Sequence, residues 1–193
     1  MNKLFVIAAL LLAALGMQAQ EEVDGAVKIG GGLDLTTSEV YVANYPRYGT
    51  FKNLVGVQGD LSFERFWKPW FGLGLNINVG HTFQERYDMD IRYTNIHAGP
   101  CYAINSRFGK HFRLDGTMGV GLGMLLSEGS REYGLGVRAS IGGEYMISDS
   151  FGLGLEVAEH YTFLFGSHDS YLPDDKISGI SRFSVLLGIR IYR

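Results

Sequence analysis

The 193-residue chain has little of several features that define common functional classes. It has one cysteine, Cys101, which excludes an intramolecular disulfide and a thiolate cluster for a metal ion. Its 17 Lys and Arg residues against 20 Asp and Glu residues give a formal net charge of -3, so the chain lacks the basic surface that binds nucleic acid. Four prolines, and 27 glycines without a period of three, do not fit a proline-rich disordered chain or collagen. We therefore expect one folded domain with no nucleic-acid partner.

The N-terminus has the pattern of a secretory signal peptide. Lys3 precedes the apolar run 4–16, and Met17-Gln18-Ala19 resembles a small-residue cleavage site. The run is shorter than the roughly 20 residues that a membrane-spanning helix needs. These features predict that residues 1–19 are removed on export and that residues 20–193 form a single domain.

Long apolar runs and helical periodicity are both missing after residue 20, and a period of two takes their place. In one segment, for example, Leu75 and Ile77 flank Asn76. Apolar residues thus share one face of an extended chain, and glycine, polar and charged residues share the other. Eight segments have this pattern: 25–37, 51–64, 70–83, 92–104, 111–125, 133–147, 151–163 and 180–193.

The length and polarity of these segments decide between two kinds of barrel. A soluble lipocalin-like barrel, the alternative fold, has an apolar interior, and ordinary strands have about five or six residues. Strands that cross a bilayer at a tilt need about 9–11 residues, and their lumenal face is polar. The sequence therefore predicts an all-β fold: an eight-stranded antiparallel transmembrane β-barrel with up-and-down meander topology.

The connections and aromatic residues predict an orientation. The connections 38–50 and 164–179 are long, whereas 148–150 is minimal, so we expect both termini in the periplasm and the long connections outside the cell. Aromatic residues near the strand ends predict two girdles at the membrane interfaces. The periplasmic set is Phe66, Trp67, Trp70, Phe71, Phe108, Phe112, Phe151 and Tyr192; the outer set is Tyr48, Phe51, Phe83, Tyr87, Tyr93, Tyr133, Tyr161, Phe163 and Phe183.

The predicted inward face has five basic and six acidic residues. An eight-stranded barrel is only wide enough for side chains to fill its interior, and buried charges need partners. We therefore expect a structural network of ion pairs that plugs the lumen, with inward glycines leaving room for long side chains; a gated pore is the alternative. The network comprises Lys28, Asp34, Asp60, Glu64, Arg113, Asp115, Arg138, Glu144, Glu156, Arg182 and Arg190.

The signal peptide, the eight alternating segments over residues 25–193 and the terminal segment 183–193 together resemble the small bacterial outer-membrane β-barrel proteins of the OmpA-transmembrane-domain and OmpX type. The resemblance implies residence in the bacterial outer membrane, contact with outer-membrane lipid and lipopolysaccharide, and insertion by the barrel-assembly machinery. It also implies a non-catalytic structural or surface-interaction role, with an extracellular ligand bound through the loops 38–50 and 164–179. A narrow channel for small solutes is an alternative function.

Motifs for cofactors, metals and catalysis are weak. Gly134-Leu135-Gly136 resembles part of a dinucleotide fingerprint, but the strand pattern continues where that motif needs a helix. The five histidines lack metal-ligand spacing, so we expect no metal and no cofactor. His160-Tyr161-Thr162 resembles the His-x-Ser pair of outer-membrane lipid A deacylase barrels, and Glu156 lies on the same face. A lipid A-modifying hydrolase is therefore a second alternative function, although we expect that the protein is not an enzyme.

Overall fold

The structure is a computed structural model that describes residues 24–38, 40–44, 47–51, 53–68, 70–86, 89–127, 130–165 and 179–193. The predicted signal peptide, residues 1–19, lies outside these residues. Within the described part of the chain, no helix has the length and apolar character needed to cross a membrane. The strands are β1 (Gly25–Thr36), β2 (Val40–Asn44), β3 (Arg47–Phe51), β4 (Leu54–Lys68), β5 (Phe71–Arg86), β6 (Met89–Phe108), β7 (Phe112–Ser127), β8 (Ser130–Ser148), β9 (Phe151–Phe165) and β10 (Gly179–Tyr192).

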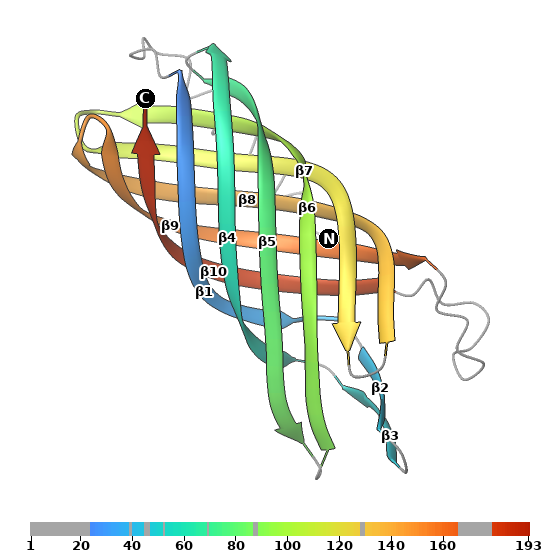
Figure 1. The fold of residues 1–193 in the computed structure, drawn as a ribbon. Helices are drawn as coiled ribbons and strands as arrows, with labels where there is room; N and C mark the ends of the chain where they lie inside the picture. Colours follow the sequence, from blue (N-terminus) through green and yellow to red (C-terminus); the bar gives the residue numbers. More distant parts are fainter. Residues whose placement is uncertain are drawn as a thin grey trace, which may run out of the picture.

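Eight of these strands form a closed barrel (Figure 1). The order around the barrel is β1-β10-β9-β8-β7-β6-β5-β4, and every neighbouring pair is antiparallel. Pairing of β1 with β10 closes the ring, with Lys28 opposite Arg190. Consecutive barrel strands are neighbours throughout, which confirms the predicted eight-stranded up-and-down topology.

The connections differ at the two ends of the barrel. At one end β4 and β5, β6 and β7, and β8 and β9 each follow one another within three residues, and Asp24 N donates to Arg193 O over 2.8 Å, which places both described chain ends there. At the other end β5 and β6, and β7 and β8, are also separated by only two residues, but the two remaining connections are long. One of these is the segment between β1 and β4, in which β2 and β3 form a separate two-stranded sheet. The sequence did not predict this hairpin, because residues 38–50 were expected to be an irregular connection. Residues 166–178 of the last connection are outside the described chain.

The faces of the barrel wall have the polarity of a membrane protein. Large apolar side chains point outward and are highly exposed, as for Leu122 (78% exposed) and Leu187 (69%). Polar and charged side chains point inward and are buried. A bilayer leaves no water to satisfy backbone groups, and a closed sheet pairs them all within the protein. A soluble lipocalin-like barrel would bury the apolar face, so this arrangement is that of a transmembrane barrel.

Three residues assigned to the aromatic girdles lie inside the barrel instead. Phe66 (6% exposed), Tyr93 (4%) and Tyr192 (4%) are buried, so their girdle assignment was wrong. They share the inward face because each lies two residues from an inward polar residue. Trp67, Trp70 and Phe112 are exposed at the end with the short turns, as expected for a girdle. Tyr87, and the side chains of Tyr48 and Phe51, lie outside what the structure describes.

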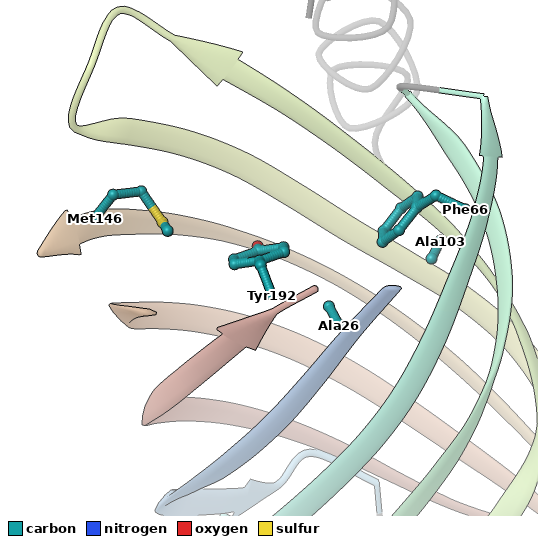
Figure 2. Close-up of a cluster of buried hydrophobic side chains, with 5 residues drawn as sticks. All are labelled: Ala26, Phe66, Ala103, Met146 and Tyr192. Carbon is teal, nitrogen blue, oxygen red and sulfur yellow. The ribbon is translucent and has the colours of Figure 1, made fainter. Parts of the chain in front are cut away.

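A cluster of buried apolar side chains lies within the barrel near its short-turn end (Figure 2). It contains Ala26, Phe66, Ala103, Met146 and Tyr192, from five different strands. The Tyr192 and Phe66 rings extend inward from the wall. We call this cluster the apolar floor. It borders the charged part of the lumen, because the Tyr192 hydroxyl donates to Glu144.

Candidate functional site

The candidate site is the polar interior of the barrel, and all eleven charged residues predicted to line it are there. None is more than 9% exposed. Their side chains project inward because residues of the same parity share one face of a strand. They come from β1, β4, β7, β8, β9 and β10, so side chains from opposite walls meet across the interior.

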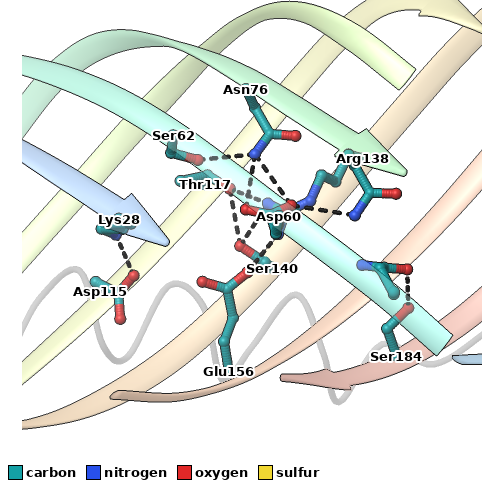
Figure 3. A network of polar contacts seen from close by, with 12 residues as sticks. Lys28, Asp60, Ser62, Asn76, Asp115, Thr117, Arg138, Ser140, Glu156 and Ser184 are labelled. Carbon is teal, nitrogen blue, oxygen red and sulfur yellow. Dashed lines mark hydrogen bonds and ion pairs between the residues drawn. The ribbon is translucent and has the colours of Figure 1, made fainter. Parts of the chain in front are cut away.

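Arg138 on β8 is the centre of the network (Figure 3). Its guanidinium forms ion pairs with Asp60 from β4, at 3.2 Å, and with Glu156 from β9. It also donates to the hydroxyl oxygens of Thr117, at 2.6 Å, and Ser140, at 3.0 Å. The arginine therefore joins strands from opposite sides of the barrel.

Arg182 extends the network toward the end with the long connections. It pairs with Asp34 over 2.8 Å, and it donates to the amide oxygens of Asn78, at 3.1 Å, and Asn95, at 3.0 Å. The Asn78 amide group in turn donates to Asp60 over 3.2 Å. The Arg182 and Arg138 groups are thereby connected through Asn78 and Asp60.

Arg190 extends the network toward the apolar floor. Its guanidinium pairs with Glu144 at 3.0 Å and with Glu156 at 3.1 Å, so Glu156 is shared with Arg138. Asn105 donates to the Tyr192 hydroxyl oxygen over 2.9 Å. The chain of contacts from Asp34 to Tyr192 therefore runs through the lumen without a break.

The remaining charges have two further environments. Lys28 pairs with Asp115 and, at 3.1 Å, with Glu64, which makes a three-residue group. Arg113 lies over the Tyr192 ring, with its guanidinium carbon 4.4 Å from the ring centroid, and donates to Asn105 over 3.4 Å. A face of an aromatic ring attracts a cation, so Tyr192 takes the place that an acidic partner has elsewhere.

Inward glycines make room for these long side chains. A Cβ atom on Gly154 would lie 3.2 Å from the guanidinium carbon of Arg190, and one on Gly80 would overlap the Arg182 guanidinium. Protein interiors are close-packed, so such overlaps displace the ion pairs rather than compress them. Glycine on the inward face thus supports the charge network, as the sequence predicted in general terms.

The uncharged members of the network were not predicted from the sequence. Asn76 donates to Asp60, at 3.0 Å, and to Ser62, at 2.7 Å, and the Ser184 hydroxyl group lies 3.1 Å from the Asp34 carboxylate and 2.6 Å from the Gln58 amide oxygen. All are buried. The period of two put these residues on the inward face, and this was the signal that could have added them to the predicted set.

His160 and Thr162 are inside the barrel, away from lipid. The Nε2 atom of His160 accepts a hydrogen bond from Arg138 over 3.2 Å, and the ring packs edge-on against His97, with centroids 5.7 Å apart. Glu156 is bound by Arg138 and Arg190. A catalytic triad needs the acid to orient the histidine and the histidine to reach the nucleophile. The described contacts of His160 are instead those of a residue in the structural network.

Gly134 and Gly136 lie within β8, which continues as a strand, so the helix required by a dinucleotide fingerprint does not follow. Within the described ranges, no group of three or more His, Cys, Asp or Glu side chains is arranged to hold a metal ion.

An outward apolar face around a charged, packed lumen defines a transmembrane β-barrel of the bacterial outer membrane. The chain matches the outer membrane protein beta-barrel domain family over residues 7–189 and belongs to that family. No curated protein sequence matches the chain.

Solved structures with a similar fold share little sequence with the chain. Neisserial surface protein A has 9% identity and a TM-score of 0.65, over 90% of this chain and 100% of that one. The outer membrane protein OprG from Pseudomonas aeruginosa has 13% identity and a TM-score of 0.53, over 91% and 99%. The outer membrane enzyme PagL has 13% identity over 86% and 98%, but its TM-score is 0.43, too low to support an argument about function.

Proposed function

We propose that the protein is a non-catalytic, non-conducting barrel of the outer membrane that acts through its extracellular loops and its contact with the surrounding lipid. The observation that supports this most strongly is the chain of contacts from Asp34 to Tyr192, which crosses the lumen along its length. A channel for solutes needs a continuous polar path that side chains leave open. With its interior filled, the barrel has only its ends and its outer wall available for partners.

The proposed orientation has both termini in the periplasm. Outer-membrane barrels have short turns on the periplasmic side and longer loops outside the cell. Both long connections, from β1 to β4 and from β9 to β10, lie at the end opposite the two described chain ends, which supports this orientation. The proposed partners are outer-membrane lipid and lipopolysaccharide, the barrel-assembly machinery during insertion, and an extracellular ligand at 38–50 and 164–179.

Labelling of intact cells tests the proposed orientation. A short epitope inserted between residues 166 and 178 should be labelled on intact cells, and the same epitope after Arg193 should be labelled only once the outer membrane is permeabilised. Labelling of the C-terminal epitope on intact cells would contradict the proposed orientation.

A deletion strain tests the proposed surface role. Shortening 38–50 and 166–178 should abolish rescue of that strain's envelope sensitivity without changing the amount of inserted barrel. Full rescue by the shortened chain would exclude a role for these loops.

Mass spectrometry of lipid A tests the proposed lack of hydrolase activity. Lipid A from cells that express the protein should have the same acyl chains as lipid A from cells that lack it. The matched control is His160→Gln, which removes the histidine of the candidate pair. Acyl-chain loss that occurs with the wild-type protein and not with His160→Gln would show that the barrel is a hydrolase.

A further inference from the structure

A groove of about 560 Å³ lies on the lipid-facing wall near the end with the short turns. The strand register explains its position. Leu114 on β7 is opposite Gly143 on β8, and Gly143 is opposite Leu155 on β9. All three positions are on the outward face of the barrel. The row of large apolar side chains is therefore interrupted at Gly143, which has no side chain. The volume is within the roughly 300–1,000 Å³ of ordinary ligand sites.

Other outward glycines show that a glycine alone does not make this groove. A Cβ atom on Gly116 would lie 3.2 Å from the Ile104 side chain, which already covers that position. At Gly143 the nearest atom, the Leu114 Cδ2, is 3.9 Å away, so the notch is open. The walls of the notch are the side chains of Leu114 and Leu155, and Tyr145 also lines the groove.

The end of the groove nearest the membrane surface has aromatic and basic groups. The Tyr145 ring contacts Phe112 edge-on at 5.4 Å and stacks on His111 at 5.7 Å. Lys110 precedes His111 in the exposed turn 109–111, and within the described chain it takes part in no ion pair. Arg107, in contrast, is paired with Asp149 at 3.2 Å. Lys110, which has no acidic partner among the described residues, therefore lies in the exposed turn next to the aromatic rim of the notch.

We propose that this groove binds one acyl chain of an anionic glycerophospholipid, with the lipid phosphate beside Lys110 and the chain in the notch at Gly143. Lys110 is four residues before Leu114, which is opposite Gly143, so the two sites are at most about 13 Å apart at ~3.3 Å per residue, a distance that an acyl chain can span from its headgroup. The wall faces hydrocarbon, and the positive charge at the rim complements a phosphate. A second copy of this chain is the competing occupant, but the self-complementary contact of a dimer would bring the two Lys110 groups to the same rim.

Native mass spectrometry of the purified protein in detergent tests this site without reference to the barrel's orientation or conductance. The probes are dimyristoyl phosphatidylglycerol and dimyristoyl phosphatidylcholine. The wild-type protein should retain one phosphatidylglycerol molecule in preference to phosphatidylcholine. Gly143→Leu, which fills the notch, should weaken that binding about tenfold, a change that corresponds to ~1.4 kcal/mol.

Two further variants keep the test decisive. Gly59→Leu is the matched control, because Gly59 also faces outward and a Cβ atom there has no atom within 4 Å, but it lies on β4, away from the groove. It should leave the adduct unchanged. Lys110→Gln, in an exposed turn, should lower the preference for phosphatidylglycerol about fivefold, since one lysine near a lipid surface contributes about 1 kcal/mol. Equal adducts in wild-type and Gly143→Leu proteins, an unchanged preference in Lys110→Gln, or a dimer that Gly143→Leu abolishes would each overturn the proposal.

Discussion

At the scale of single residues, the lumenal charges depend on partners that lie far away in the sequence. Burying a charged group costs several kcal/mol, and ion pairs with good geometry offset that cost. Arg138 has the most extensive set of partners, because it pairs with Asp60 and Glu156 and donates to two hydroxyl groups. Its removal would leave two buried carboxylates with fewer partners.

Arg138→Ala should therefore reduce the free energy of unfolding by about 3–5 kcal/mol, the usual cost of removing one member of a buried ion pair. Arg131→Ala is the matched control, since Arg131 is the same residue type on the same strand but is exposed. Its effect should stay within about 0.5 kcal/mol. Reversible urea unfolding in lipid vesicles measures both variants, and equal losses would show that the buried network does not stabilise the barrel.

The residues of the site could be predicted from the sequence, but their pairings could not. Alternation places Lys28 and Asp115 on inward faces, yet their contact joins residues 87 positions apart and depends on how the strands align across the lumen. Phe66 and Tyr192 show a different failure. Their position near turns suggested a girdle, whereas their parity with Glu64 and Arg190 places them inside, and parity determines which way a strand residue points.

At the scale of elements, six of the eight barrel strands are longer than their alternating segments, whereas β1 and β10 are not. The predicted segment 92–104 is part of β6, Met89–Phe108, because the residues on both sides of the segment also pair with neighbouring strands. The central part of each strand was predictable, since the bilayer imposes alternation there. The ends were not, because outside the hydrocarbon both faces tolerate polar residues. The β2–β3 hairpin lies in such a region.

Substitutions on the outward face should show this dependence on depth. Leu75 and Ile147 are both 58% exposed, but Leu75 is four residues inside β5 and Ile147 is next to the last residue of β8. Leu75→Arg should cost about 2–4 kcal/mol in unfolding free energy, and Ile147→Arg about 0–1 kcal/mol, because an arginine near the interface remains hydrated. Refolding equilibria in lipid vesicles would measure the difference. Equal costs would contradict the membrane depth that the strand bounds imply.

At the scale of the whole molecule, two groups of side chains together close the interior of the barrel. The charge network crosses the lumen, and the apolar floor of Ala26, Phe66, Ala103, Met146 and Tyr192 lies near the short-turn end. Tyr192 belongs to both, because its ring packs in the floor while its hydroxyl donates to Glu144. An interior filled by side chains is what an eight-stranded barrel permits.

Single-channel recording in planar bilayers tests this closed interior most directly. Purified wild-type protein, inserted at known density, should give no stable unitary current in concentrated salt, because ions have no open polar path through the paired charges. Reproducible, ion-selective current steps from the wild-type protein would show that the lumen conducts, and would contradict the closed barrel.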